Sequence, residues 1–168
     1  MKILGIDPGK KTGYAMLRFE KDKEPHPIAG GILEIESSPR SKGKEVVDYM
    51  VRIEELLLDL KPNLIAVEHP AGGYVSMVLP TYGRMLAVSI LPHMNIDIAK
   101  HLYIRDCIEV FPPKWKKVVV GKGNASKKFV KEYVLREYSD YAEEYFKGQD
   151  QIDAFCIALW AAKTVVVE

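Results

Sequence analysis

The sequence predicts one mixed α/β domain over residues 1–168, with a central five-stranded sheet and helices on both of its faces. Short apolar runs that stop at turn residues alternate with longer segments whose apolar residues recur every three or four positions. The first three runs lie close together, which favours an antiparallel meander. Helical segments separate the later runs, which favours parallel strands joined by right-handed crossovers.

The first three strands are expected at Ile3–Asp7, Gly13–Phe19 and Ile28–Ile35, between turn-rich or charged segments. Asp7 stands where the first apolar run stops, and Pro8-Gly9 turns the chain toward the second strand. Taken alone, this aspartate is explained equally well as a turn residue that hydrogen-bonds its own backbone or as a functional carboxylate at a strand end. The later segments must decide between the two.

Helices and strands alternate through the rest of the chain. Ser41–Leu60 shows one apolar face at helical spacing, and Lys61-Pro62 ends that helix. The next strand should run parallel to the first, because a crossover helix separates the two. The remaining expected elements are a strand at Asn63–Glu68, a mostly apolar helix at Pro80–Met94, a strand at Tyr103–Phe111, a helix capped by Asn124 or Ser126 that runs to about Tyr138, and an apolar helix from Asp150 to about Lys163.

Composition excludes several classes of protein. Hydrophobic residues make up 48% and charged residues 28% of the chain, as in ordinary soluble proteins. No apolar run approaches the roughly 20 residues that cross a bilayer. Met1-Lys2 leads straight into a strand, so we expect no signal peptide and a cytoplasmic location, either at the nucleoid or, for a viral protein, in the host cell. Cys107 and Cys156 stand among apolar residues, which indicates buried thiols and no disulfide framework.

Charge is unevenly distributed, although the net charge is only +1. Seven lysines and no acid lie between Lys114 and Lys131, and six acids with one lysine lie between Glu137 and Asp153. Most lysine clusters are solvated surface, and a nucleic-acid-binding surface is the sharper alternative. Trp115, set among these lysines, could stack on a base or pack in the core. The DNA-binding candidates in this segment are Lys114, Trp115, Lys116, Lys117, Lys122 and Lys128.

Four carboxylates should meet at one edge of the sheet. Asp7 and Glu68 end strands that are expected to be parallel neighbours, and ligand sites favour the carboxyl ends of such strands. Asp150 and Asp153 stand three residues apart at the start of the last helix and share a face, although Asp150 alone could be only an N-cap. Clustered acids require bound cations or protonation, and oxygen ligands suit Mg²⁺ or Mn²⁺. Two such ions can drive phosphodiester cleavage.

The residues also resemble a known family, the RuvC-type Holliday junction resolvases. Its four signature segments look like ILGIDPGKKTGYA, IAVEHP, VVVGKGNASK and DQIDAFCIALWA, in similar order and spacing from Met1 to about Ala162. The resemblance implies an RNase H-like fold, Mg²⁺ with Mn²⁺ as a substitute, two ions per site, and a homodimer that nicks four-way DNA junctions symmetrically. By position it implies that Asp7, Glu68, Asp150 and Asp153 are the metal-binding catalytic acids and that Lys127, with Lys116 or Lys117, lies near the scissile phosphate.

One segment departs from the family pattern. After Glu68 the family usually carries an aromatic residue that stacks at the opened junction centre, and here the chain runs from His69 to Tyr74, which makes Tyr74 the candidate. The expected function is therefore metal-dependent cleavage of four-way junctions. The alternatives are a nuclease for flaps, forks or RNA–DNA hybrids, a junction-binding protein without catalysis on the same fold, and a kinase of related fold, which would need two copies of the domain.

Overall fold

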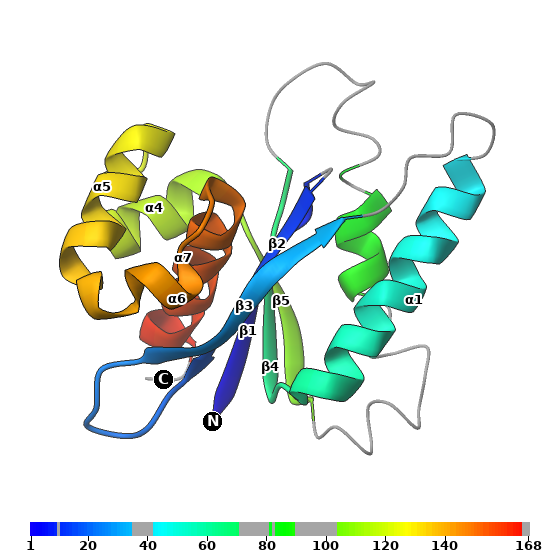
Figure 1. The fold of residues 1–168 in the computed structure, drawn as a ribbon, viewed down its shortest axis with the longest axis horizontal. Helices are drawn as coiled ribbons and strands as arrows, with labels where there is room; N and C mark the ends of the chain where they lie inside the picture. The colour runs from blue at the N-terminus through cyan, green and yellow to red at the C-terminus, as the bar shows by residue number, and fades with distance from the viewer. Residues whose placement is uncertain (10, 35–41, 71–80, 82, 90–103, 166–168) are drawn as a thin grey trace.

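The computed structural model describes residues 1–9, 11–34, 42–70, 81, 83–89 and 104–165, and its centre is a five-stranded sheet between two helical layers (Figure 1). The sheet order is β3-β2-β1-β4-β5. The first three strands pair antiparallel, whereas β4 runs parallel to both β1 and β5, which confirms the expected mixed sheet. The strands are β1 (Lys2–Asp7), β2 (Lys11–Arg18), β3 (His26–Glu34), β4 (Leu64–Glu68) and β5 (Asp106–Val110).

One helical layer covers each face of the sheet (Figure 1). The helices on one face are α4 (Pro112–Val120), α5 (Lys127–Glu137), α6 (Ala142–Tyr145) and α7 (Gln149–Thr164), with a 3₁₀ turn at Ser139–Tyr141. The other face carries α1 (Lys42–Leu60) and the helical residues 83–89. Successive strand residues point to opposite faces of the sheet and so pack in two hydrophobic cores, one on each face. Ile3 packs on the α7 side, while Leu4 and Ile6 pack on the α1 side.

Helix α7 lies directly on the backbone of the first two strands. A Cβ atom on Gly5 would stand 2.1 Å from the carbonyl oxygen of Ala154, and one on Gly13 would stand 2.0 Å from that of Asp150. Every residue of α7 from Gln151 to Ala162 is buried, as its apolar sequence predicts. The two glycines therefore allow a helix–sheet distance that no side chain would permit.

The α1 layer contains a buried ion pair. The Arg84 guanidinium contacts the Glu45 carboxylate at 2.6 Å, and both side chains are 9% exposed. Beside it, the Thr12 hydroxyl donates to the Tyr49 hydroxyl at 3.4 Å, and Tyr49 is fully buried with Ile53 on the inner face of α1. These contacts join α1 to β2 and to residues 83–89, so the second layer is fixed by polar as well as apolar groups.

Some elements differ from the sequence-based expectation. Helix α4 was not predicted from the sequence, and it includes three consecutive valines, Val118–Val120, whose intrinsic propensity favours a strand. Pro112-Pro113 starts this helix, and Gly121 ends it in the left-handed conformation with φ 79°. Of the two capping candidates for α5, Ser126 is the cap and accepts from the Phe129 amide at 3.2 Å. Parts of the expected helix Pro80–Met94 and residue 103 of the next strand lie outside the described residues.

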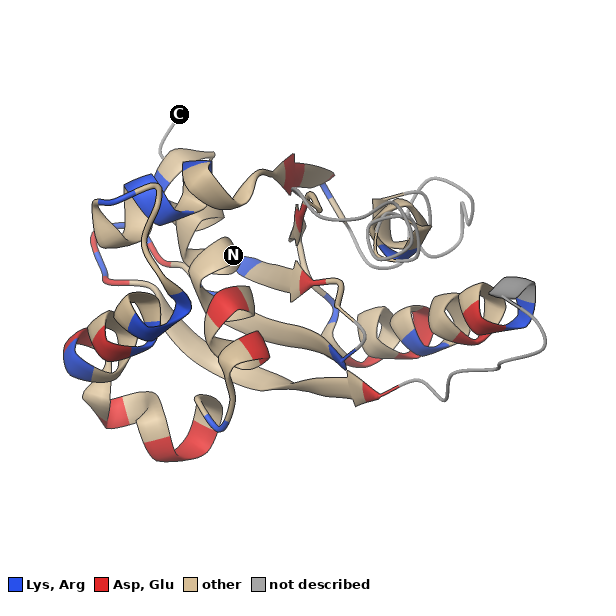
Figure 2. Cartoon of the chain, turned by 90° about the horizontal axis from the view of Figure 1, so that it is seen from above, with Lys and Arg blue, Asp and Glu red and all other residues tan. Residues whose placement is uncertain are grey.

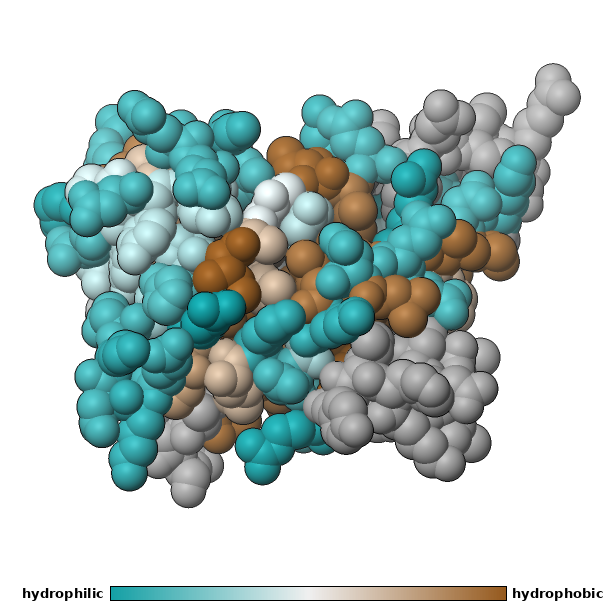
Figure 3. All heavy atoms as spheres, turned by 60° about the horizontal axis from the view of Figure 1, so that its bottom comes forward, coloured by the Kyte–Doolittle hydropathy of each residue, from teal (hydrophilic) through white to brown (hydrophobic). Residues whose placement is uncertain are grey.

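Two expectations about the class of protein can be compared with the described residues. None of their helices combines the length and apolarity needed to span a bilayer. Both cysteines are free thiols, Cys156 buried and Cys107 half-buried. Figure 3 brings forward the end of the molecule at which the N-terminus lies, and it shows apolar residues interspersed with polar ones.

Replacing Gly13 with alanine should destabilise the protein, because the new methyl group would overlap the Asp150 carbonyl oxygen on α7. Overpacking of this kind costs about 1–3 kcal/mol, and backbone cannot swing aside as a side chain can. The melting temperature should fall by at least about 3 °C in thermal unfolding. Gly83→Ala is the matched control, since a Cβ atom at residue 83 would meet nothing within 4 Å. Equal melting temperatures for the two variants would contradict the close α7–sheet contact.

Candidate metal centre

The four predicted acids lie at the carboxyl ends of β1 and β4 or on the helix that covers them. Strand alternation places Asp7 on the same face of β1 as Ile3 and Gly5, which is the face that α7 covers. Glu68 ends β4, whose parallel register sets Val67 opposite Ile6 and so brings Glu68 beside Asp7. The acids from α7 arrive because Asp150 lies against Gly13, and Gly13 is the β2 partner of Asp7.

Helix α7 presents its acids in its first two turns. Gly148 is the N-cap residue and provides no side-chain cap, so the alternative role of Asp150 as an N-cap is not what the structure shows. Asp150 is half-buried, whereas Asp153, one turn further, is only 6% exposed. The predicted shared face of the two residues is therefore directed toward the sheet edge.

The candidate carboxylates influence one another's ionisation. Burial raises the pKa of Asp7 well above its usual value, and the negative charges of Glu68, Asp153 and Asp150 raise it further. Burial also raises the pKa of Glu68 to about 7, and Asp153 adds to this shift. The pKa of Asp153 is raised as well, chiefly by burial. Nearby positive charge, such as a bound cation, would stabilise the ionised form of these acids.

Protein donors hold two of the acids. The indole Nε1–H of Trp115 donates to Glu68 Oε2 at 2.6 Å, and the Gln149 amide donates to Asp153 Oδ1 at 2.8 Å. Lys127 places its ammonium group 3.8 Å from Asp153 Oδ2, with its side chain 70% exposed. Lys127 also lowers the pKa of Asp7, so its charge acts on the site as a whole.

These residues fit a hard divalent cation in donor type and in charge. All four candidate ligands are carboxylates, which suit Mg²⁺ and similar ions. Within the described ranges, no three Asp, Glu, His or Cys side chains are already gathered as a metal-binding group.

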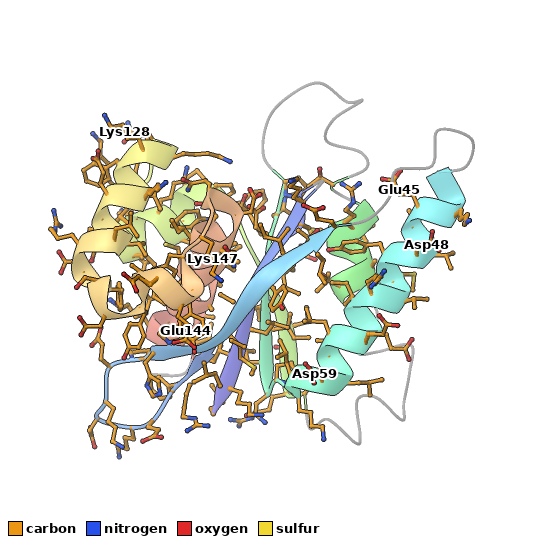
Figure 4. All side chains as sticks on the ribbon, viewed as in Figure 1. Glu45, Asp48, Asp59, Lys128, Glu144 and Lys147 are labelled. Carbon is orange, nitrogen blue, oxygen red and sulfur yellow. The ribbon has the colours of Figure 1, made fainter. Side chains whose placement is uncertain are left out.

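A lysine-rich surface borders the site on the α4–α5 side. Four of the candidate DNA-binding residues are exposed there, namely Lys114, Lys117, Lys122 and Lys128. Figure 2 shows the basic positions on α4 and α5, and Figure 4 places Lys128 at the start of α5, across the sheet from Glu45 and Asp48 of α1. Lys116 is partly buried and donates to the Ala125 carbonyl at 3.1 Å. It still lies close enough to lower the pKa of Glu68 and Asp153.

The two aromatic candidates have different outcomes. Trp115 is 1% exposed and belongs to the core, so the expectation that it faces DNA is not supported and the packing alternative is. Its polar edge reaches Glu68, a contact that no sequence pattern indicated. Tyr74 lies outside the described residues.

An aromatic pair at the same strand ends was not predicted from the sequence. Phe111 is 53% exposed, and its ring centroid lies 4.2 Å from that of His69, with an interplanar angle of 31°. His69 follows Glu68 directly, and its amide donates to the Val110 carbonyl at 2.8 Å. The sequence feature that could have indicated this pair is Phe111 itself, an aromatic residue that stands between an apolar strand and Pro112-Pro113, outside the buried part of the strand.

Comparisons with known proteins identify the family to which the chain is similar. The family profile described as crossover junction endodeoxyribonuclease RuvC matches residues 3–160. Relatives of that name are 31% identical in Synechococcus sp. (strain CC9605), over 96% of this chain and 97% of the relative, and 27% identical in Caldanaerobacter subterraneus subsp. tengcongensis, over 95% and 90%.

Solved structures agree on the fold. Thermus thermophilus RuvC superposes with a TM-score of 0.75 at 22% identity, covering 99% of this chain and 96% of that one. The same protein in complex with Holliday junction substrate gives 0.73 at 19% identity, with coverages of 99% and 96%. The yeast mitochondrial Holliday junction resolvase Ydc2 gives 0.67 at 16% identity, with coverages of 96% and 78%. The expected RNase H-like fold and endodeoxyribonuclease class are thus confirmed, and the chain belongs to the RuvC family of crossover junction endodeoxyribonucleases.

Proposed function

We propose that this protein resolves four-way DNA junctions by metal-dependent hydrolysis at the site formed by Asp7, Glu68, Asp150 and Asp153. The observation that carries the proposal is that the parallel register of β1 and β4 and the contact of α7 with Gly13 bring these acids to one sheet edge, where burial and the negative field of the neighbouring carboxylates raise the pKa of Asp7. Such a field is costly unless cations bind, and the family to which the chain belongs cleaves DNA crossovers.

Asp7 is the proposed shared ligand of two Mg²⁺ ions, for which Mn²⁺ substitutes. It is the central acid, because the carboxylates of Glu68, Asp153 and Asp150 all act on it. Glu68 and Asp153 would each hold one cation, and Asp150 would complete the set. When bound, the cations supply an activated water and stabilise the leaving oxygen of the phosphodiester.

Lys127 is the proposed catalytic cation of the chain itself. Its ammonium group lies beside Asp153, and its exposed side chain can turn toward a phosphate at the site. There it would stabilise the negative charge that grows on the phosphate oxygens in the transition state. The neighbouring exposed lysines would hold the DNA backbone, and the open face of Phe111 would contact bases.

Each chain contributes one such site, and symmetric nicking of a junction requires two. We therefore propose a homodimer with two-fold symmetry, in which the two sites face strands of like polarity. The α4–α5 layer would contact DNA, because it borders the acids and carries the exposed lysines (Figure 4).

Asp153→Asn should abolish cleavage of a labelled synthetic four-way junction. Loss of a residue that only supports a metal ligand lowers affinity or activity about 10–100-fold, so loss of a ligand should lower the rate at least about a hundredfold. The assay compares the junction with linear duplex, a flap and an RNA–DNA hybrid in Mg²⁺. Asp140→Asn, an exposed acid beyond α5, is the control and should cleave normally.

Each outcome of this assay has a distinct meaning. Paired symmetric nicks on the junction alone support resolution, whereas cleavage of the flap or hybrid instead would retain the metal site and replace the substrate. Junction binding without cleavage under any divalent cation would favour a non-catalytic protein.

In the absence of divalent cations, stability should decrease as the pH rises from about 4.5 to above 7. Burial raises the pKa of Glu68 from 4.5 to about 7, so the folded state holds this proton more tightly than the unfolded state. The resulting stabilisation is complete below the ordinary pKa and is lost as the pH passes the raised one. Thermal melts in EDTA should therefore show a shallower decrease for Glu68→Gln than for the wild type. Parallel curves would contradict the assignment.

Binding of an uncut junction in EDTA should become less salt-dependent when Lys117, Lys122 and Lys128 are replaced by alanine. Each phosphate contact contributes about 0.9 to the slope of log K against log salt, so the slope should flatten by up to about 2.7. The control replaces Lys21 and Lys23, which are exposed on the β2–β3 connection. An unchanged slope in the triple variant would move the DNA to another face.

A further inference from the structure

The two tryptophans of the chain differ in how their indole N–H groups are used. Trp160 is 4% exposed, and among the described residues its Nε1–H has no hydrogen-bond partner. Trp115 is 1% exposed, and its Nε1–H donates to Glu68 Oε2 at 2.6 Å. Burial of an indole in this core therefore does not by itself supply a partner. The contact between Trp115 and Glu68 depends on where α4 places the ring.

Helix α4 fixes that ring firmly. Trp115 belongs to the core shared with α7, which contains Val119 and Phe155. Above the ring, the Lys116 ammonium lies 5.5 Å from the centroid while its Nζ donates to the Ala125 carbonyl. A tryptophan has few rotatable bonds, and here packing occupies its body, so the N–H direction is set by the backbone of α4.

The donor is also electrically neutral. An Arg or Lys in the same place would orient Glu68 but would neutralise the charge that a cation needs. The indole lowers the pKa of Glu68 by its hydrogen bond and leaves the negative charge intact. It engages Oε2, which leaves Oε1 as the oxygen without this contact.

We infer that Trp115 is a positioning residue for Glu68, holding one carboxylate oxygen so that the other is presented to a divalent cation. This inference rests on the proposed function, in which Glu68 is a metal ligand. Loss of the indole N–H leaves Glu68 free to rotate about its own bonds, so cation binding must order it. The variant therefore needs more cation but reaches a normal rate once the cation is in excess.

The test compares Trp115→Phe with Trp160→Phe, which removes the other indole and leaves the donor to Glu68 in place. For Trp115→Phe, the Mg²⁺ concentration at half-maximal junction cleavage should rise about 10–100-fold, with the rate at saturating Mg²⁺ largely retained. Trp160→Phe should show the wild-type Mg²⁺ requirement. A purely structural role would lower the maximal rate and the melting temperature without this split, and that outcome would overturn the inference.

A second readout does not depend on cleavage. In Trp160→Phe the only indole is that of Trp115, so its fluorescence reports on the hydrogen bond to Glu68. Mg²⁺ added without DNA should shift this emission, and the shift should disappear in Trp160→Phe combined with Glu68→Gln. If the fluorescence emission of Trp160→Phe does not change when Mg²⁺ is added, the inference is overturned, even where Trp115→Phe fails to fold.

The proposed function and the role of Trp115 fail separately. Wild-type protein that neither cleaves junctions nor gains thermal stability in Mg²⁺ would overturn the proposed function, and the inference with it. Wild-type protein that cleaves in Mg²⁺, beside a Trp115→Phe variant with an unchanged Mg²⁺ requirement, would overturn the inference alone.

Discussion

The close contact between α7 and the sheet is the constraint on which the site depends. Gly5 and Gly13 have no side chains to separate the helix from the strands, so the first turns of α7 lie close to Asp7. Strand alternation then decides which carboxylates can join them, because Asp7 shares its face of β1 with Gly5. A shift of either strand by one residue would turn its acid toward α1 and leave the acids of α7 without neighbours.

Bringing acids together opposes folding, and the structure limits that cost without removing it. Trp115 and Gln149 each donate to one acid through a neutral N–H, which orients the carboxylate and partly offsets its desolvation. Positive charge comes from Lys116, which is partly buried and bonded to the Ala125 carbonyl, and from Lys127, whose side chain remains mostly exposed. The buried pair Arg84–Glu45 on the other face shows that the fold can also enclose a full ion pair.

Much of this site could be predicted from the sequence because its residues follow simple periodicities. Asp7 and Glu68 end apolar strands, and Asp150 and Asp153 are three residues apart on a helix, so topology alone brings them together. What could not be predicted depends on packing between distant segments. The lysines around Trp115 in sequence left open whether it stacks on a base or packs in the core, and helix α4 turns it inward while Lys114 and Lys117 stay exposed. The valines Val118–Val120 have a strand propensity by themselves, and the contacts of α4 with α7 override that propensity.

The arrangement of donors separates two tasks that one residue type could not perform together. A ligand to a cation must be held still and must keep its charge, which favours a buried neutral donor such as the Trp115 indole. A group that stabilises a reacting phosphate must carry charge and must meet the substrate, which favours an exposed lysine such as Lys127. Exchanging the two would place a fixed cation against Glu68, where it competes with the metal, and a neutral group at the phosphate. Buried neutral donors that orient the acids, and an exposed lysine that can reach the phosphate, therefore follow from the chemistry of charge, given four acids at one edge of a sheet.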